Sequence, residues 1–320
     1  MKTIPKMMWM MLACGTPALA GTAIVDAPPG DAGISTSQGD WLKDLRRPMT
    51  NPTLFDLAAP TTGIRPIFVH HELPDFMETT LGRVPVGGDV QVYALQFEYA
   101  LSDRFSIVAT KDGYIDFNPS ATFTDASGFA NLGGGVKYAF LLDPEQRHAL
   151  SGSMTFEFPT GNSDVLQGEG DGAVNLILSG VKMIDDWQFA GGAGVSLPFS
   201  GEMSTTGFIS THVSYEVTPW FIPLVELNWF TVLDPGNGSR NFAGQVGGLV
   251  PGVATFEGHD FFNLGASNSS RNRDLVTAAV GFRSRITDDI HAGLAYEIPL
   301  TDEEASVIDS RVTLDLTWRF

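Results

Sequence analysis

The sequence predicts an all-β protein: a single transmembrane, antiparallel, up-and-down β-barrel of about twelve strands. Three observations predict it. The chain begins with a secretory signal, it repeats segments of about ten residues with alternating polarity from about residue 63 to its end, and short and long connections between these segments alternate. With 43% hydrophobic and 18% charged residues, the chain is too apolar to be disordered.

The charge of the chain excludes one class of partner. Its 320 residues include 37 Asp and Glu against 19 Lys and Arg, a formal net charge of -18. A strongly acidic chain repels phosphate backbones, so we expect no binding of nucleic acid through a basic surface.

Residues 1–20 have the order of features of a signal peptide. Lys2 and Lys6 give a positive start, residues 7–13 form an apolar stretch, and Ala18-Leu19-Ala20 is a small-residue cleavage site, so we predict cleavage after Ala20. Cleavage leaves 19 − 2 = 17 basic residues, and 17 − 37 gives a formal charge of -20. A buried helix of a cytosolic protein is the alternative interpretation of this segment.

The single cysteine, Cys14, lies inside the predicted signal, so the mature chain needs no disulfide. A lipoprotein acylated on Cys14 is a second alternative, although Met11 matches the expected residue poorly. After the signal no run of eighteen apolar residues occurs, so a membrane-spanning chain would have to be a barrel.

Residues 21–60 differ in composition from the rest of the chain. Pro28-Pro29-Gly30, Pro48 and Pro52 predict an irregular segment, with a short helix at most over residues 40–47. The segment starts on the periplasmic side. It either extends there, which we favour, or threads into the lumen as a plug.

The barrel is predicted over residues 61–320, with strands rich in Val, Phe, Tyr, Thr and Gly. The last strand shows the pattern best, because from Arg311 to Phe320 every even position is apolar and every odd one polar, which places the two sets on opposite faces. The twelve predicted strands are 63–71, 89–100, 104–112, 130–141, 147–158, 172–182, 187–197, 206–217, 220–231, 273–286, 290–299 and 307–320. Short links alternate with long ones, as in outer-membrane barrels with short periplasmic turns and long extracellular loops.

Each strand has an apolar face, predicted to contact lipid, and a polar face, predicted to line the lumen. The lumen-lining candidates are Glu98, Lys137, Glu157, His212, Glu216, Glu226, Arg283, Arg285, Glu297, Arg311, Asp315 and Arg319. A charge facing the bilayer centre costs about 2–4 kcal/mol, so these side chains belong inside, where they line an aqueous path or form a network that closes it.

Aromatic side chains gather where strands meet the short turns, which is typical of a membrane-interface girdle. They are Tyr99, Phe105, Tyr138, Phe140, Trp187, Tyr215, Trp220, Phe221, Trp318 and Phe320. The end of the chain also resembles the C-terminal signal that outer-membrane barrels present to their assembly machinery. The residues of this predicted assembly signal are Leu314, Leu316, Trp318 and Phe320.

The longest connection, residues 232–272, is rich in glycine and also apolar. The residues that could contact an apolar ligand are Phe242, Leu249, Phe256, Phe261 and Phe262. A loop of this length is usually functional or folded on itself. We expect it to cover the barrel mouth, either presenting an apolar surface to a solute or serving as a lid without a ligand.

One group of residues has the spacing found in the active sites of some enzymes. His212 and Ser214 share a strand face, and Glu226 could orient the imidazole, as in outer-membrane lipid esterases. Tyr215 and Glu216 depart from the pattern of those enzymes, and the pair is predicted to face the lumen, away from lipid. We therefore expect no enzymatic activity, and the esterase ranks third among the functions below.

Two stretches of sequence resemble a known family. Gly133-Gly134-Gly135-Val136-Lys137-Tyr138 and Phe156-Glu157-Phe158-Pro159-Thr160-Gly161-Asn162, followed by Gly170-Asp171-Gly172, resemble the outer-membrane family named after the meta pathway of phenol degradation. The resemblance covers about residues 60–320. It implies a transporter-like barrel for hydrophobic compounds and supplies no catalytic residue.

The sequence thus predicts a porin-like protein of a Gram-negative outer membrane, a passive channel or transporter for a small, hydrophobic, aromatic-like solute. The alternative is a structural or surface-interaction barrel with a closed lumen. The partners expected are outer-membrane lipids and lipopolysaccharide, the barrel-assembly machinery and the solute. No cofactor or metal site is predicted, since His70 and His71 point to opposite faces of a strand.

Overall fold

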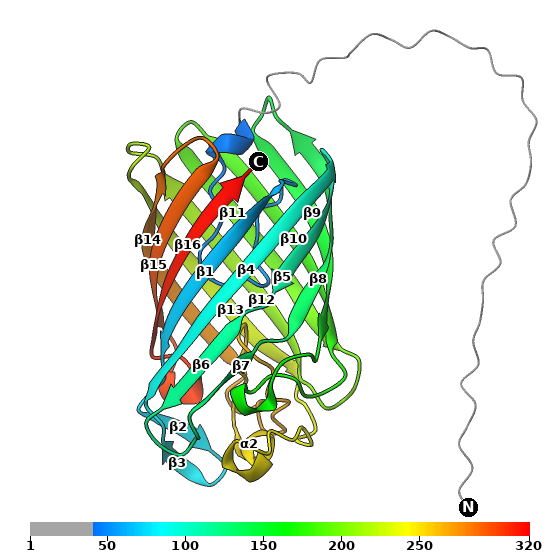
Figure 1. The fold of residues 1–320 in the computed structure, drawn as a ribbon, viewed down its shortest axis with the longest axis vertical. Helices are drawn as coiled ribbons and strands as arrows, with labels where there is room; N and C mark the ends of the chain where they lie inside the picture. Colours follow the sequence, from blue (N-terminus) through cyan, green and yellow to red (C-terminus); the bar gives the residue numbers. More distant parts are fainter. Residues whose placement is uncertain (1–40) are drawn as a thin grey trace, which may run out of the picture. The chain divides into compact units, whose positions relative to one another are not determined.

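A computed structural model describes residues 41–320, and in it twelve strands form one closed antiparallel barrel (Figure 1). The strands are β1 (Gly63–Glu72), β4 (Gly88–Ser102), β5 (Phe105–Lys111), β8 (Leu132–Asp143), β9 (His148–Phe158), β10 (Ala173–Ile184), β11 (Trp187–Pro198), β12 (Thr205–Tyr215), β13 (Ile222–Asp234), β14 (Asp274–Arg285), β15 (Ile290–Pro299) and β16 (Ser310–Arg319). β1 closes the barrel by pairing with both β4 and β16. The predicted fold class is confirmed. Among residues 41–320 no helix is long and apolar enough to cross a membrane.

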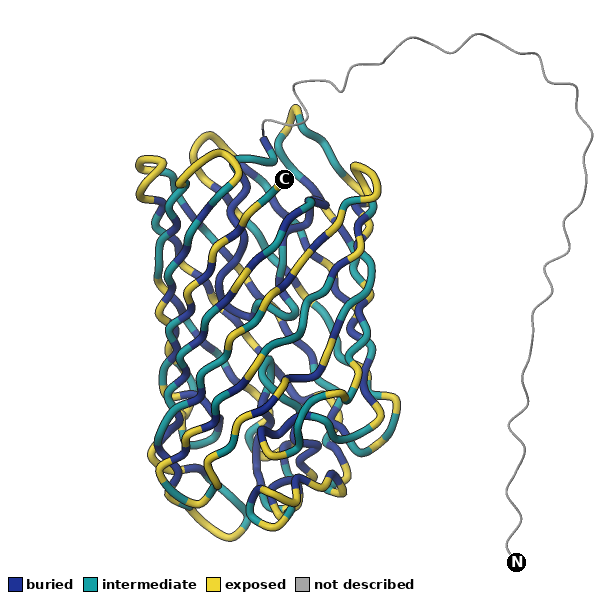
Figure 2. Tube along the Cα trace, in the orientation of Figure 1, coloured by how far each residue is buried: buried dark blue, intermediate teal, exposed yellow. Residues whose placement is uncertain are grey.

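The alternation of polarity in the sequence corresponds to the two faces of the wall. In β16, Leu314, Leu316 and Trp318 are exposed on the outside, while Asp315 and Thr317 between them are buried inside. Figure 2 shows the same alternation of buried and exposed residues along the other strands. Because a closed sheet pairs the backbone groups of every strand, it needs no water at its edges.

The connections lie at the two ends of the barrel according to their length. Turns of a few residues join β4 to β5, β8 to β9, β10 to β11, β12 to β13 and β14 to β15 at the upper end in Figure 1, where the C-terminus also lies. We call this the short-turn end. The predicted aromatic residues there include Tyr99, Phe140, Trp187, Trp220 and Phe320, all exposed on the outer surface.

The long loops at the opposite end contain short elements of their own. These are β2 (Phe76–Thr79), β3 (Gly82–Pro85), β6 (Tyr114–Pro119), β7 (Ala126–Phe129), η1 (Ser163–Val165), η2 (Val246–Gly248), α2 (Val250–Val253) and η3 (Glu303–Ala305). β6 continues the wall beyond β5 by pairing with the extended β4, after a break at Asp112 and Gly113. We call this the long-loop end.

Residues 41–60 lie inside the barrel, and this corrects the predicted periplasmic extension. Trp41, Leu45 and Phe55 are buried, and Trp41 and Leu45 pack against Ala149, Val181 and Met183 of the wall. We call residues 41–60 the plug. The alternative prediction, a plug threaded into the lumen, therefore describes residues 41–60. Residues 21–40 and the predicted signal at 1–20 lie outside the described part of the chain.

Two glycines show how closely the plug fits the wall. Gly192 and Gly293 face inward, and a Cβ atom on either would collide with Phe55 or with Met49 of the plug. Side chains of the plug thus fill spaces that the wall leaves open. Composition alone predicts an irregular segment, but only this fit places it in the lumen.

Candidate binding site

The inner face of the wall holds a dense set of charged and polar side chains. All the lumen-lining candidates predicted from strand parity lie on this face: Glu98, Lys137, Glu157, His212, Glu216, Glu226, Arg283, Arg285, Glu297, Arg311, Asp315 and Arg319. Most of them pair with each other or with the plug. The interior is therefore a cross-linked network around a central segment.

Asp315 is at the centre of one part of the network. Its carboxylate accepts hydrogen bonds from Arg65 Nε at 2.6 Å and from both terminal nitrogens of Arg283 at 2.9 and 2.8 Å. Each arginine also holds the plug, because Arg65 donates to the carbonyl of Pro48 and Arg283 to that of Arg47, both at 2.7 Å. The wall thus binds plug carbonyls through side chains oriented by one buried carboxylate.

A second group holds the plug through its own charges. Arg47 lies 2.9 Å from Asp56 of the plug and 3.0 Å from Glu98 of β4. Lys137 of β8 contacts the same two carboxylates, at 3.2 Å and 3.0 Å. Two cations and two carboxylates therefore alternate across the contact between plug and wall.

The short-turn end of the lumen is closed by a third group. Glu216 accepts from Arg46 of the plug at 2.7 Å and from Arg285 of the wall at 2.6 Å. Gln188 binds both backbone groups of Arg46, at 2.8 and 2.6 Å. Arg319 donates to the carbonyls of residues 42, 43 and 45.

His212, Ser214 and Glu226 form the hydrogen-bond chain expected of a catalytic triad. His212 Nε2 lies 2.9 Å from Ser214 Oγ, and Nδ1 lies 2.7 Å from Glu226 Oε1. However, all three are buried, and Glu226 accepts from the backbone nitrogens of Met49 and Thr50, at 2.8 and 2.7 Å. The carboxylate therefore anchors the plug, and the arrangement leaves Ser214 out of reach of a lipid ester.

The longest loop, residues 235–273, reaches into the lumen from the opposite end. Asp260 of this loop lies 2.7 Å from Arg311 of β16, which also contacts Glu297 at 3.3 Å. Thr53 of the plug donates to the carbonyl of Asp260 at 3.5 Å. Plug and loop therefore meet inside the barrel.

The sequence did not identify several groups of this network. Arg65 has the parity of a lumenal residue, but its strand also places Ile67 and Val69 inward, which masks the pattern. Asp56 and Asp260 belong to irregular segments, where no periodicity assigns a face. Their partners follow from the tertiary fold alone.

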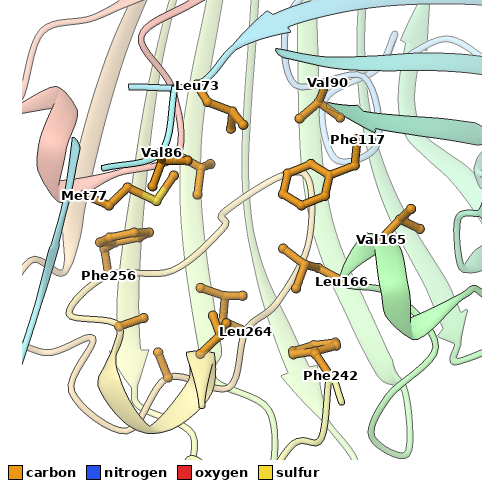
Figure 3. Close-up of a cluster of buried hydrophobic side chains, with 14 of the residues drawn as sticks. Leu73, Met77, Val86, Val90, Phe117, Val165, Leu166, Phe242, Phe256 and Leu264 are labelled. Carbon is orange, nitrogen blue, oxygen red and sulfur yellow. The ribbon is translucent and has the colours of Figure 1, made fainter. Parts of the chain in front are cut away.

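A cluster of apolar side chains caps the long-loop end (Figure 3). Figure 3 shows Leu73, Val90, Phe117 and Leu166 facing Phe242, Phe256 and Leu264 of the longest loop. We call residues 235–273 the cap. The cap is folded on itself and on its neighbouring loops, as was expected of a lid over the mouth.

The predicted ligand candidates of the cap occupy different positions. Phe242 is fully buried in the cluster beneath the guanidinium of Arg240, whose carbon lies 4.8 Å from its ring centre. Leu249, Phe256 and Phe262 line a pocket of about 110 Å³. Phe261 points toward the lumen, where it contacts His71 and Arg311.

The pocket under the cap is almost wholly apolar. Its walls include Met77, Leu81, Phe117, Val250 and Leu264, and hydroxyl groups enter only through Thr79 and Thr122. A second pocket of about 60 Å³ lies further inside, between Phe261, the plug residues Pro52 and Thr53, and the wall. Adjacent aromatic residues, Phe262 and Phe261, therefore each line one of the two pockets.

Buried polar groups hold the cap in shape. Glu257 accepts from the backbone nitrogens of Leu264 and Ala266, both at 2.7 Å, and from Ser204 Oγ at 2.5 Å. Burial raises the pKa of this carboxyl. Burial also lowers the pKa of Arg240 to about 10 and that of His259, which packs on Phe230, to about 4.

No group of three or more His, Cys, Asp or Glu residues in the described part of the chain could hold a metal ion. His71 faces the lumen and His70 faces outward, as strand geometry requires.

The fold is similar to that of a solved outer membrane channel from Pseudomonas putida F1. The likeness has a TM-score of 0.55 and 16% sequence identity, and it covers 82% of this chain and 96% of that one. Similarity also extends to the porins NanC, with 8% identity over 81% of this chain and 100% of that one, and KdgM, with 9% identity over 80% and 99%. Their TM-scores of 0.48 and 0.43 are too low to support an argument.

No family model matches the chain, and no curated protein matches it. The predicted resemblance to the phenol-pathway family therefore stays a prediction. At 16% identity the likeness to the channel from P. putida shows the fold alone, a closed antiparallel β-barrel.

Proposed function

We propose that this protein is an outer-membrane channel that takes up a small hydrophobic solute, which binds first in the apolar pocket under the cap. The pocket is the observation that carries the proposal. At about 110 Å³ it approaches the size of cavities, about 150 Å³, that stay dry and bind benzene. A solute of about one aromatic ring fits this volume and lining.

The orientation in the membrane follows from the lengths of the connections. Short turns face the periplasm and long loops face the exterior in barrels of this kind, so the cap contacts the medium and lipopolysaccharide. The signal at residues 1–20 would direct export, and the C-terminal strand would contact the barrel-assembly machinery.

Passage through the barrel requires movement of the plug. The second pocket ends at Pro52 and Thr53, and beyond it Arg47, Glu98 and Asp315 connect plug and wall. This occlusion also favours the alternative, a structural or surface-interaction barrel with a closed lumen. Uptake measurements separate the two functions.

The test is uptake of a labelled small aromatic hydrocarbon by cells that produce the protein. Leu249→Asp places a carboxylate at a half-exposed position that lines the pocket, so we expect uptake to fall to background, while Leu249→Met retains it. Deletion of residues 240–265 should also abolish uptake. If neither change alters uptake of the hydrocarbon, the pocket has no role in transport.

A channel that works without the pocket and a closed barrel give different results. If both variants take up the hydrocarbon as fast as the wild type, and faster than cells without the protein, the protein is a channel whose route avoids the pocket. Uptake no higher than in those cells supports the closed barrel.

A further inference from the structure

Lys182 occupies an unusual position on the outer wall. Among the twelve described barrel strands, it is the only Lys or Arg on the lipid-facing side; all others face the lumen. It lies two residues before the end of β10, near the short-turn end. A cation costs about 0–1 kcal/mol at such an interfacial depth, so the position is tolerated, but the fold does not require it.

His148 stands directly beside Lys182. The two are paired across β9 and β10 and share the outer face. His148 Nδ1 is buried and has no hydrogen-bond partner. Lys182 Nζ donates to the carbonyl of Gln146 and forms no ion pair with any described residue. Since an ammonium group has three donors, two remain for a ligand.

The next row of outward positions toward the bilayer centre has two glycines at its middle. Leu150, Gly180, Gly191 and Thr211 are successive cross-strand partners on β9 to β12. The two glycines leave a depression between larger apolar neighbours. The surface depression has a volume of about 750 Å³, and Leu178, Phe189 and Ile209 contribute to its rim.

Close packing does not explain these glycines. A Cβ atom on Gly180 would lie 3.6 Å from its nearest neighbour, and one on Gly191 would lie 3.7 Å away, both ordinary van der Waals contacts. At Gly135 and Gly281, by contrast, a Cβ atom would collide with a backbone carbonyl of the adjacent strand. The wall could carry side chains at residues 180 and 191, so the depression is available to another molecule.

We propose that this surface binds one glycerophospholipid of the periplasmic leaflet, with its phosphate on Lys182 and His148 and one acyl chain in the depression at Gly180 and Gly191. The order of chemical groups along the wall matches the ligand. The ammonium of Lys182 and the imidazole of His148 lie near the short turns, at headgroup depth, and the apolar depression lies toward the bilayer centre. The chain as a whole carries a net charge of -18. One carboxylate adjoins the pair: Asp143 of β8, the cross-strand partner of His148, accepts a hydrogen bond from the backbone nitrogen of Gln146.

The test is native mass spectrometry of the purified full chain in detergent, titrated with dioleoyl phosphatidylglycerol. We expect one lipid to bind first, and Lys182→Gln to weaken its binding about fivefold, since one basic residue near an anionic lipid contributes about 1 kcal/mol. Gly180→Leu and Gly191→Leu should weaken it similarly by filling the depression, without loss of the heat-resistant barrel.

Arg104→Gln is the matched control. Arg104 is an exposed cation at another turn of the short-turn end, away from β9 to β12, so its removal should leave lipid binding unchanged. Dioleoylglycerol lacks the phosphate. Its affinity for the wild type should be no higher than the affinity of phosphatidylglycerol for Lys182→Gln.

Two results would overturn the proposal. Equal occupancy in the wild type, Lys182→Gln and Gly180→Leu would mean that the wall has annular lipid only. Loss of a dimer in the glycine variants, with lipid occupancy unchanged, would assign the depression to a second copy of the chain. Neither result depends on whether the barrel transports a solute.

Discussion

At the scale of single residues, the lumen is held together by buried charges that each serve more than one partner. Asp315 orients Arg65 and Arg283, and these two arginines in turn bind backbone carbonyls of the plug. Removing one member of a buried ion pair is costly because the remaining charge stays desolvated. The carboxylate of Asp315 therefore stabilises both the wall and the plug.

We predict that Asp315→Asn destabilises the barrel by about 3–5 kcal/mol, because two buried guanidinium groups lose their charged acceptor. Urea-induced unfolding in detergent measures the effect. Asp288→Asn is the control, since Asp288 is largely exposed on a turn and 3.8 Å from Lys43, and its removal should change stability by no more than about 0.5 kcal/mol. Equal effects of the two substitutions would contradict the prediction.

The hydrogen-bonded arrangement of His212, Ser214 and Glu226 shows what residue spacing can and cannot establish. Spacing correctly predicted that the first two share a face, and the structure joins them to Glu226 by hydrogen bonds. A nucleophile also needs access to its substrate, and Ser214 is only 1% exposed. Contacts between residues far apart in the chain decide that Glu226 anchors the plug and that Ser214 is buried.

At the scale of elements, the barrel contains two inserted segments that approach each other from opposite ends. The plug occupies the lumen from the short-turn end, and the cap covers the long-loop end; they meet at Thr53 and Asp260. Each is held by side chains of the wall. The plug therefore fills the lumen, and the cap covers its long-loop end.

We predict that deleting residues 41–60 opens an ion-conducting path, because the plug fills the lumen between the inner faces of the strands. Single-channel conductance in planar bilayers should rise from near background to a clearly resolved level. Deletion of residues 240–265 provides the comparison, since it removes the cap but leaves the plug, and its conductance should stay low. A high conductance in the wild type would disprove the role of the plug.

The cap should lose stability in acid through His259. Burial lowers the pKa of His259 to about 4, below the 6.5 of an exposed imidazole, so the folded cap favours the neutral ring. This contribution to stability is fully present above pH 6.5 and is lost as the pH falls through about 4; it amounts to up to about 3 kcal/mol.

Limited proteolysis of the cap at pH 7 and pH 4.5 measures this effect. We expect faster cleavage at the lower pH in the wild type and a smaller increase in His259→Phe, which keeps the ring contact with Phe230. Burial raises the pKa of Glu257, so its protonation acts in the opposite direction, and the difference between the two proteins isolates the histidine. An identical pH dependence in both would contradict the assignment.

At the scale of the whole molecule, the outer surface of the barrel carries the features needed in a membrane. Apolar side chains cover the strands, aromatic residues gather at the short-turn end, and Leu314, Leu316, Trp318 and Phe320 are exposed on or beside the last strand. The last set is the assembly signal expected from the sequence.

We predict that deletion of Phe320 lowers the amount of protein in the outer membrane several-fold but leaves its refolding from urea into detergent unchanged. Phe320 is 71% exposed, so the finished barrel gains little from its ring. Immunoblots of membrane fractions measure the first effect and heat-modifiable mobility the second. Leu300→Ala, at an exposed apolar residue of a long loop, is the control. Impaired refolding of the deletion variant would assign Phe320 a structural role instead.

The sequence by itself determined the wall of this protein. Alternation of polarity predicted the strands, their two faces and the lumenal positions of residues such as Glu98 and Asp315, because a strand places successive side chains on opposite sides. The alternation of short and long connections predicted the separation of the two ends. These features depend on neighbours in the chain, so they can be derived from it.

Only the tertiary structure decided what fills the barrel. Residues 41–60 and 235–273 have no regular periodicity, and their positions depend on contacts between residues far apart in the chain, such as Met49 with Glu226 and Asp260 with Arg311. The sequence favoured a periplasmic position for the first segment because its composition is irregular. Inside the closed barrel, the backbone carbonyls and charged side chains of residues 41–60 bind buried polar groups of the wall. No local pattern in the sequence shows these partners, and their contacts place the segment in the lumen.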